Sequence, residues 1–388
     1  MVRGPLLRLL NPRTFPILRN VAVIAHVDHG KTTLLRQCIA DERAMDSITI
    51  ASKAKICRTR HQICHHFLRF SSGVSYKPLE ESIRIAVSHK TYEQIPDLLT
   101  SSEQSCNKQN PFLFFSSFTL SHRTRIVDEM LQSFIPLKPH CRLKTTYHCL
   151  LSYTLQSSHP FPLALAILQR TLRSGCTPVP QTHLSLSAAW IHQQRQLESV
   201  PSILLGMKSI GYCPDSGTCN FVIRSLCAVD QLEEAVEVLR GMSEVACVPD
   251  AESYCTIIDA YCELRKTDNA VVMMKEMVRK LRLSPRQGTL VRLVASLRAN
   301  KEIWIAAEMI EFLEKKGFHV GFESYELVVE GCLECKKFIL AGKMTMMMTE
   351  KGYIPYIKVR QKVVEGLAGV DEWKLACAVR HRFAEMNS

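Results

Sequence analysis

The chain has 388 residues and a formal net charge of +12, and this length is typical of two or three domains. No apolar run approaches the roughly 20 residues that a membrane-spanning helix needs, so we expect a soluble protein without a membrane span. The 16 cysteines follow no extracellular disulfide pattern, which favours a reducing compartment over secretion.

Residues 1–19, MVRGPLLRLLNPRTFPILR, contain four arginines and no acidic residue. A basic, acid-free and leucine-rich start is typical of a mitochondrial or chloroplast transit peptide, although serine is scarce here. The alternative is an ordinary basic segment that leads into a strand. We expect a mitochondrial protein, with the chloroplast as the alternative.

Residues 20–53 begin with the β-branched run VAVIA, followed by a phosphate-loop pattern in which Ala25 replaces the first glycine. Strand, tight loop and helix N-terminus would present backbone N–H groups to a polyphosphate, with Lys31 on the terminal phosphates and Thr32 on Mg²⁺. The candidate nucleotide-binding residues are Asp28, His29, Gly30, Lys31 and Thr32. The segments LRNVAVIAHVDHGKTTL and ERAMDSI resemble the start of TypA/BipA-type translational GTPases over about residues 18–53.

This resemblance stops inside the first switch of the GTPase family. Ser47 runs almost directly into ITIASK, and no later segment matches the D-x-P-G or N-K-x-D motifs. A GTPase domain needs a sheet of about six strands, which some 34 residues cannot build. We therefore expect a truncated α/β P-loop fragment without GTPase activity, from a fused or mis-spliced gene. GTP binding remains a minor alternative.

Residues 54–78 form a basic tract, and we expect an unstructured linker there. Between residues 47 and 79 the chain has six Lys and Arg and no Asp or Glu. The segment CRTRHQICHH offers Cys57, His61, Cys64, His65 and His66, but no periodicity positions them around a zinc ion. Cys332 and Cys335 in CLEC have no second pair to complete a site. We expect no metal, no cofactor and no catalytic residue.

We expect degenerate helical repeats over residues 79–144, and residues 145–388 contain a regular repeat. Turn prolines fall at Pro178, Pro214, Pro249, Pro285 and Pro355, with Val320 in the remaining place. A turn column contains Gly175, Gly211, Ala246, Leu281, Gly317 and Gly352, and a small-residue column contains Ala164, Val200, Ala235, Ala270, Ala306, Ala341 and Ala376. Their spacing of 35 or 36 residues establishes an internal repeat.

Each unit contains two apolar stripes of helical period, so we expect a helical hairpin. One hairpin cannot bury both stripes alone, and stacked neighbours would form an all-α, right-handed α-solenoid. The units are 145–179, 181–215, 216–250, 251–286, 287–321 and 322–356, and a shorter unit covers 357–388. The 35-residue hairpin ending in G-x-x-P-D resembles the plant organellar pentatricopeptide repeat of the P type over about residues 80–388.

The resemblance implies binding of single-stranded organellar RNA, with one base recognised by the fifth and the last residue of each unit. The candidate pairs are Ser185 with Asp215, Asn220 with Asp250, and Cys255 with Arg286. A small hydroxyl with Asp favours guanine in the family, and Asn with Asp favours uracil. Cys149/Val179, Val291/Gly321 and Glu326/Tyr356 complete the series, and these three pairs, like Cys255/Arg286, lack that chemistry.

We expect a monomer that acts in RNA processing, stability or translation, alone or with other RNA-processing proteins. The alternative is a protein–protein interaction scaffold in an organellar complex. The charge along the binding groove separates the two, because a positive stripe favours RNA.

Overall fold

The computed structural model describes residues 79–101, 110–196 and 199–386. The expected transit peptide, the P-loop fragment with Asp28, His29, Gly30, Lys31 and Thr32, and the basic linker lie outside these ranges. Every element within the described ranges is helical, which confirms the all-α prediction for this part of the chain. None of these helices is long and apolar enough to cross a membrane.

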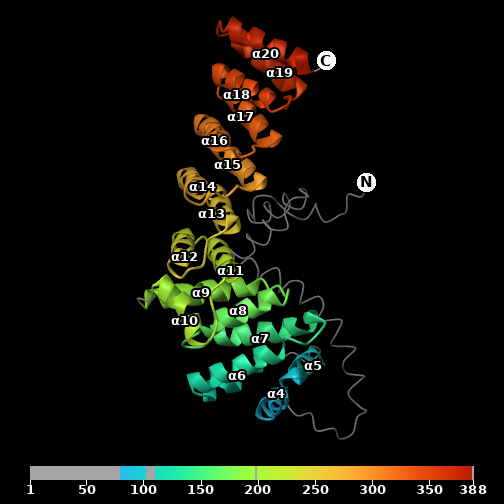
Figure 1. Cartoon of the computed structure of the whole chain (residues 1–388), viewed down its shortest axis with the longest axis vertical. Coiled ribbons are helices and arrows are strands. Elements are labelled where there is room, and N and C mark those ends of the chain that lie inside the picture. Colours follow the sequence, from blue (N-terminus) through green and yellow to red (C-terminus); the bar gives the residue numbers. More distant parts are fainter. Residues whose placement is uncertain (1–78, 102–109, 197–198, 387–388) are drawn as a thin grey trace, which may run out of the picture. The chain divides into compact units, whose positions relative to one another are not determined.

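First and second helices alternate from residue 144 onward. The first helices are α7 (Lys144–Leu155), α9 (Gln181–Arg195), α11 (Ser216–Cys227), α13 (Ala251–Glu263), α15 (Gln287–Ala299), α17 (Phe322–Glu334) and α19 (Ile357–Ala368). The second helices are α8 (Leu163–Arg173), α10 (Val200–Ser209), α12 (Leu232–Glu244), α14 (Thr267–Leu281), α16 (Ile303–Lys315), α18 (Phe338–Glu350) and α20 (Trp373–Met386). Each hairpin packs against the hairpins before and after it (Figure 1).

Helices also precede the regular hairpins. They are α4 (Leu79–Ser88), η2 (Tyr92–Gln94), α5 (Ile95–Ser101), η4 (Leu113–Ser117), α6 (Leu120–Ser133) and η5 (His140–Leu143). Helix α5 packs against α7, and α6 packs against α8. These helices therefore extend the array of hairpins.

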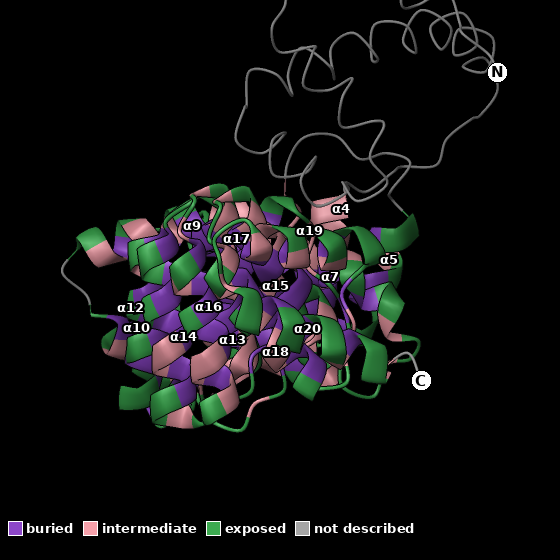
Figure 2. Cartoon of the chain, turned by 90° about the horizontal axis from the view of Figure 1, so that it is seen from above, coloured by how far each residue is buried: buried purple, intermediate pink, exposed green. Residues whose placement is uncertain are grey.

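The hairpin of α11 and α12 shows why the units stack. Val222, Ile223 and Leu226 of α11 are buried, and so are Val238 and Met242 of α12. The two stripes face different neighbours, because α11 contacts α9 and α13 as well as α12. Buried positions lie on the inside of the helix array and exposed ones at its margins (Figure 2). Burial of these stripes supplies the main favourable term for stacking.

Left-handed backbone occurs at both turns of the hairpins. After the second helices, φ is positive at Gly175, Gly211, Ala246, Arg282, Gly317 and Gly352. The turn column predicted Leu281, but α14 continues through that residue and ends with Arg282 in the left-handed region. Between the first and second helices, φ is positive at Asp230, Arg265, Lys301, Lys336 and Asp371. This second series was missed because it contains no glycine, the residue that normally signals such a backbone.

Candidate nucleic-acid interface

The last residue of each unit lies at the N-terminus of the following first helix. Asp215 caps α11 and Asp250 caps α13, each accepting a hydrogen bond from the backbone N–H three residues later. The donors are Thr218 and Ser253, both at 2.9 Å. The pattern of Asp followed after three residues by Thr or Ser is a capping signal that the sequence contains. Capping places both carboxylates at the ends of adjacent first helices.

Asn220 and Asp250 form a hydrogen-bonded pair. Nδ2 of Asn220 lies 3.1 Å from each carboxylate oxygen of Asp250. Oδ1 of Asn220 accepts from the Ser253 hydroxyl at 2.6 Å, and Asn220 is only 6% exposed. The amide is held at both ends. One N–H directed between the two carboxylate oxygens accounts for both contacts of Nδ2, which leaves the second N–H and one lone pair of Oδ1 for a ligand.

Ser185 and Asp215 have other partners. The hydroxyl of Ser185 donates to the carbonyl of Gln181 in its own helix at 3.3 Å. Asp215 accepts from Arg173 at 2.8 and 3.1 Å and from the Thr218 hydroxyl at 2.6 Å. Burial is the largest single influence on the pKa of Asp215, and it raises that pKa. The hydrogen bonds from Thr218 and Arg173 together outweigh burial, so the pKa of Asp215 lies below its usual value. No hydrogen bond joins Ser185 to Asp215 in the described structure.

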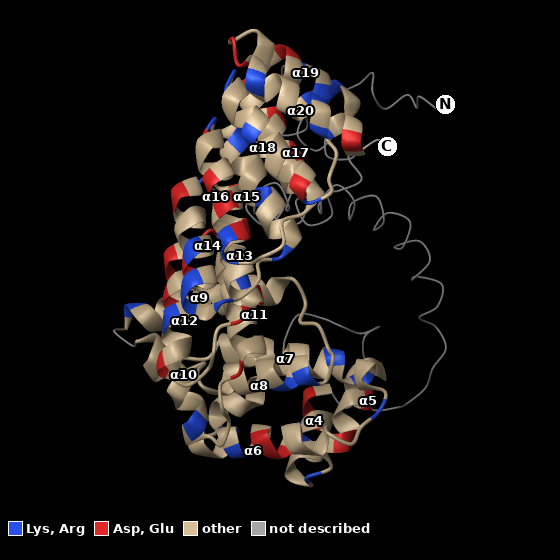
Figure 3. Cartoon of the chain, turned by 45° about the horizontal axis from the view of Figure 1, so that its top comes forward, with Lys and Arg blue, Asp and Glu red and all other residues tan. Residues whose placement is uncertain are grey.

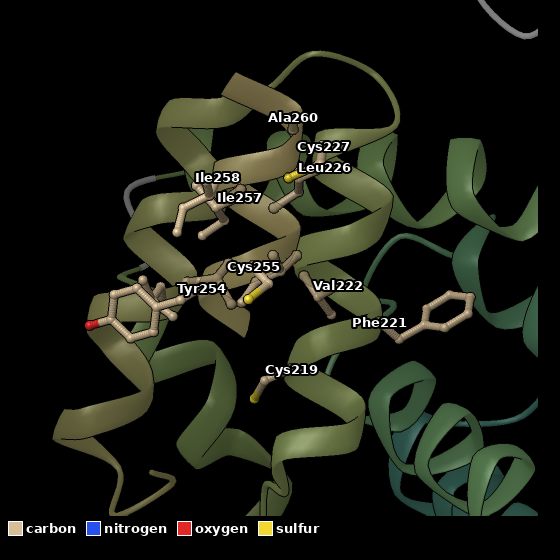
Figure 4. Close-up of a cluster of buried hydrophobic side chains, with 14 of the residues drawn as sticks. Cys219, Phe221, Val222, Leu226, Cys227, Tyr254, Cys255, Ile257, Ile258 and Ala260 are labelled. Carbon is tan, nitrogen blue, oxygen red and sulfur yellow. The ribbon is translucent and has the colours of Figure 1, made fainter. Parts of the chain in front are cut away.

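Cys255 and Arg286 are also separate. Cys255 is fully buried, and in Figure 4 its side chain lies among the apolar side chains of α11 and α13. Arg286 has a half-exposed side chain that forms an ion pair with Glu252 at 3.4 Å. A thiol in this position behaves as a small core hydrophobe, so the structure does not bring this candidate pair together.

Glu326 and Tyr356 are in contact although their types lack the expected chemistry. The backbone N–H of Tyr356 donates to Oε1 of Glu326 at 3.3 Å. Glu326 is 5% exposed, and burial raises the pKa of its carboxyl group. A glutamate inside a buried helical stripe was the sequence signal for this unusual position, and its contact with Tyr356 was not predicted. Val179, Val291 and Gly321, all half-buried, bring no side-chain hydrogen-bonding group to their places.

Ion pairs between neighbouring hairpins neutralise much of the charge along the first helices. Arg224 pairs with Glu252, Arg286 with Glu252, Arg292 with Asp259, and Arg298 with Glu330 and Glu334. Figure 3 accordingly shows both signs of charge along α13 to α18. The arginines of α11 and α15 therefore lie in ion pairs with carboxylates of the next hairpin or of the one before.

Among the described residues, no group of three or more His, Cys, Asp or Glu side chains could hold a metal ion. Cys332 is buried and Cys335 is half-buried. Burial raises the pKa of Cys332 to about 12, so this thiol remains protonated at neutral pH. The cluster from Cys57 to His66 lies outside the described residues.

Comparisons with known proteins agree with the repeat. The PPR repeat family model matches residues 214–263, and the PPR repeat model matches residues 252–280. A pentatricopeptide repeat-containing protein of Arabidopsis thaliana is 57% identical over 326 residues, which cover 84% of this chain and 94% of that protein.

Solved structures of one such protein are also similar. The crystal structure of pentatricopeptide repeat protein PPR10 from maize is 17% identical with a TM-score of 0.38, over 98% of this chain. The chain spans 59% of the length of that structure. A crystal structure of PPR10 in complex with an 18-nt psaJ RNA element is 14% identical with a TM-score of 0.24, over 95% of this chain and 79% of that one.

Proposed function

Because the chain belongs to the pentatricopeptide repeat family, we propose that it binds single-stranded RNA, one base to a hairpin. The finer proposal is an organellar protein that acts in RNA processing, stability or translation. Its location is the mitochondrion, with the chloroplast as the alternative. We assign it no catalytic activity.

The observation that carries this proposal is the pair of Asn220 and Asp250. The carboxylate and Ser253 hold the amide in one orientation, so its remaining donor and acceptor are fixed before a ligand arrives. The edge of uracil presents a carbonyl oxygen beside an N–H group, which matches that donor and acceptor. Prior orientation of this kind reduces the entropy lost on binding. We therefore assign uracil to hairpin 216–250.

The preceding hairpin, 181–215, is assigned guanine through Ser185 and Asp215. In this assignment Asp215 keeps its ion pair with Arg173, and the serine hydroxyl turns from its own helix towards the base. Family members lie parallel to their RNA, so guanine precedes uracil in the expected target.

A protein scaffold is the second candidate function. The ion pairs between hairpins favour it, because each paired arginine is less available to phosphate. Nonspecific RNA affinity depends mainly on such phosphate contacts. If RNA is the partner, we therefore expect modest affinity and a shallow dependence on salt.

The test is a titration of fluorescent 12-mer RNAs with the full chain at fixed salt. An RNA containing GU should bind better than one containing GA. Asn220→Ala should weaken the GU RNA by about tenfold, the effect of one base contact of roughly 1–3 kcal/mol. Asn220→Ser should shift the preference at that base from uracil towards guanine.

Asn269→Ala is the matched control, because Asn269 is an exposed asparagine on the second helix α14. It should bind like the parent chain. Thermal melting of each variant separates loss of binding from loss of folding. Equal binding of all RNAs by a folded parent chain would exclude base recognition and support the scaffold.

A further inference from the structure

A surface hollow of about 330 Å³ lies at the start of α18, and we call it the α18 hollow. Its apolar walls come from the first turn of α18 and from the turn before α20, and they consist of Phe338, Ile339, Leu340 and Val370. Ile339 and Val370 are each 43% exposed. Exposed apolar side chains that gather in a hollow, instead of lying singly on the surface, are typical of interaction sites.

The fold holds one wall of this hollow in place. The ring of Phe338 packs so closely on α19 that a Cβ added to Gly366 would lie 2.2 Å from it. A second hollow, of about 400 Å³, also includes Phe338 and Gly366. Because the ring is wedged against a backbone without a side chain, the α18 hollow exists before any ligand arrives, which reduces the cost of binding.

The rim of the hollow is positively charged. It carries Lys336, Lys337 and Lys343, and no acidic side chain of the described chain lines it. Asp371 and Glu372 follow Val370 in the chain, but neither one lines the hollow. The arginines of α11 and α15 form ion pairs, whereas these three lysines have none in the described structure. The N-terminus of α18 adds the positive end of a helix dipole to the same place.

We propose that the α18 hollow binds an acidic, amphipathic helix of another protein. One large apolar side chain of that helix enters the hollow, and carboxylates on the adjacent turns pair with the lysines of the rim. A helix supplies both groups, because residues three or four apart lie about 5–6 Å from each other on one face. Nucleic acid fits less well, because phosphates would pair with the lysines and leave the apolar walls exposed to water.

The hollow lies away from the candidate base-recognition residues. Lys336 follows the C-terminus of α17, whereas the last residue of each unit precedes the N-terminus of a first helix. Helix α17 has 13 residues and is therefore about 20 Å long. A protein partner in the α18 hollow would leave the bases of a bound RNA accessible to their hairpins, so this inference goes beyond the proposed function.

The test is a titration of fluorescent 16-residue peptides with the full chain at fixed salt. The first peptide contains glutamate and leucine, with the leucines at helical spacing i, i+3, i+4 and i+7. A second peptide has lysine in place of glutamate, and a third has serine in place of leucine. The first should bind saturably and more weakly as salt increases. The second should not bind, and the third should bind at least about tenfold more weakly than the first.

Two variants of the chain locate the binding site. Lys336→Glu and Ile339→Ser should each weaken the acidic leucine peptide by about tenfold. Lys301→Glu is the matched control for the first, because Lys301 is also exposed, also has positive φ and lies one repeat earlier. Val272→Ser is the control for the second, because Val272 is an exposed β-branched residue of the second helix α14. Thermal melting shows that each variant is folded.

Three results would overturn the inference. One is the absence of binding by the folded parent chain, or equal binding by the parent, Lys336→Glu and Ile339→Ser, which would place the peptide elsewhere. Another is equally tight binding of the serine peptide, because the hollow would then take charge alone. The third is a loss of affinity for the GU RNA in Lys336→Glu as large as the loss for the peptide, which would assign the lysines to phosphate. The parent's preference for GU over GA RNA is measured separately, so failure of the proposed function is distinguishable.

Discussion

At the scale of single residues, His183 shows how a titratable side chain becomes part of a helix interface. Its ring stacks on Phe221 with a centroid distance of 4.6 Å and an angle of 12°. Its Nδ1 lies 2.8 Å from the Ser225 hydroxyl oxygen. Burial, and to a lesser degree the charge of Arg224, lower the pKa of His183 to about 4. The imidazole is therefore neutral where α9 meets α11.

This pKa predicts how stability depends on pH. Between about pH 6.5 and 4 the unfolded chain binds a proton at His183 and the folded chain does not. The contribution of the neutral His183 ring to the free energy of unfolding is therefore complete above pH 6.5 and is lost as the pH falls towards 4. We expect a loss of about 1–2 kcal/mol from this residue, less than the full shift implies because solvent reaches part of the ring.

Urea unfolding of the full chain at pH 7.5 and pH 4.5 provides the measurement. His183→Phe retains an aromatic ring without a titrating group, so its stability should fall less than that of the parent chain. His192→Phe, at an exposed position of the same helix, should retain the parent's pH dependence. An unchanged pH dependence in His183→Phe would show that other groups cause it.

At the scale of helices, glycine on a first helix admits a large side chain from the preceding second helix. A Cβ on Gly366 of α19 would lie 2.2 Å from the ring of Phe338, the first residue of α18. A Cβ on Gly331 of α17 would lie 2.5 Å from Ile303, the first residue of α16. The two contacts repeat after one unit and set how closely successive hairpins approach.

Gly366→Ala should therefore destabilise the chain. Overpacking costs about 1–3 kcal/mol, which exceeds the roughly 0.5–1 kcal/mol that alanine gains over glycine in a helix. Gly288→Ala is the control, because nothing lies within 4 Å of its added Cβ, and it should be neutral or slightly stabilising. Thermal unfolding compares the two. In a Phe338→Ala background the cost of Gly366→Ala should disappear, and a persistent cost would refute the steric explanation.

At the scale of the whole array, hydrogen bonds join helices far apart in sequence. The hydroxyl of Tyr212, after α10, donates to Asp128 of α6 at 2.7 Å. Tyr92 donates to Glu129 of the same helix at 2.8 Å. Burial and the Asp128 carboxylate raise the pKa of Tyr212, so it remains a donor at neutral pH. The helices before residue 144 are thereby attached to the regular hairpins.

Because most contacts in the stacked array join adjacent hairpins, we expect a local response when this attachment is weakened. Tyr212→Phe should cost about 1 kcal/mol and accelerate amide hydrogen exchange in α6. Exchange in α17 and α18 should not change. Hydrogen-exchange mass spectrometry of the full chain measures both regions. Uniform acceleration throughout the described helices would mean that the array opens as one cooperative unit instead.

The sequence by itself determined the hairpins and their order. Helical stripes, capping residues such as Asp250, and turns with glycine or proline are local signals, and a period of 35 residues repeats them. The left-handed turn at Arg282 was placed one residue early because α14 is longer than the period implies. The left-handed turns at Lys301 and Lys336 could not be predicted from the sequence, because lysine does not normally mark a positive φ. The packing of the two helices that each lysine joins imposes this backbone conformation.

Only the tertiary structure decided which fifth and last residues meet. Asp215 and Asp250 have the same sequence context, yet Arg173 engages the first and Asn220 the second. Glu326 gave no sign that its carboxyl group would reach the backbone of Tyr356. Such contacts depend on side-chain directions and on competing partners from adjacent hairpins, which lie more than 25 residues away in the chain. Local sequence determines the position of a side chain on its helix, and packing between hairpins determines which groups that side chain contacts.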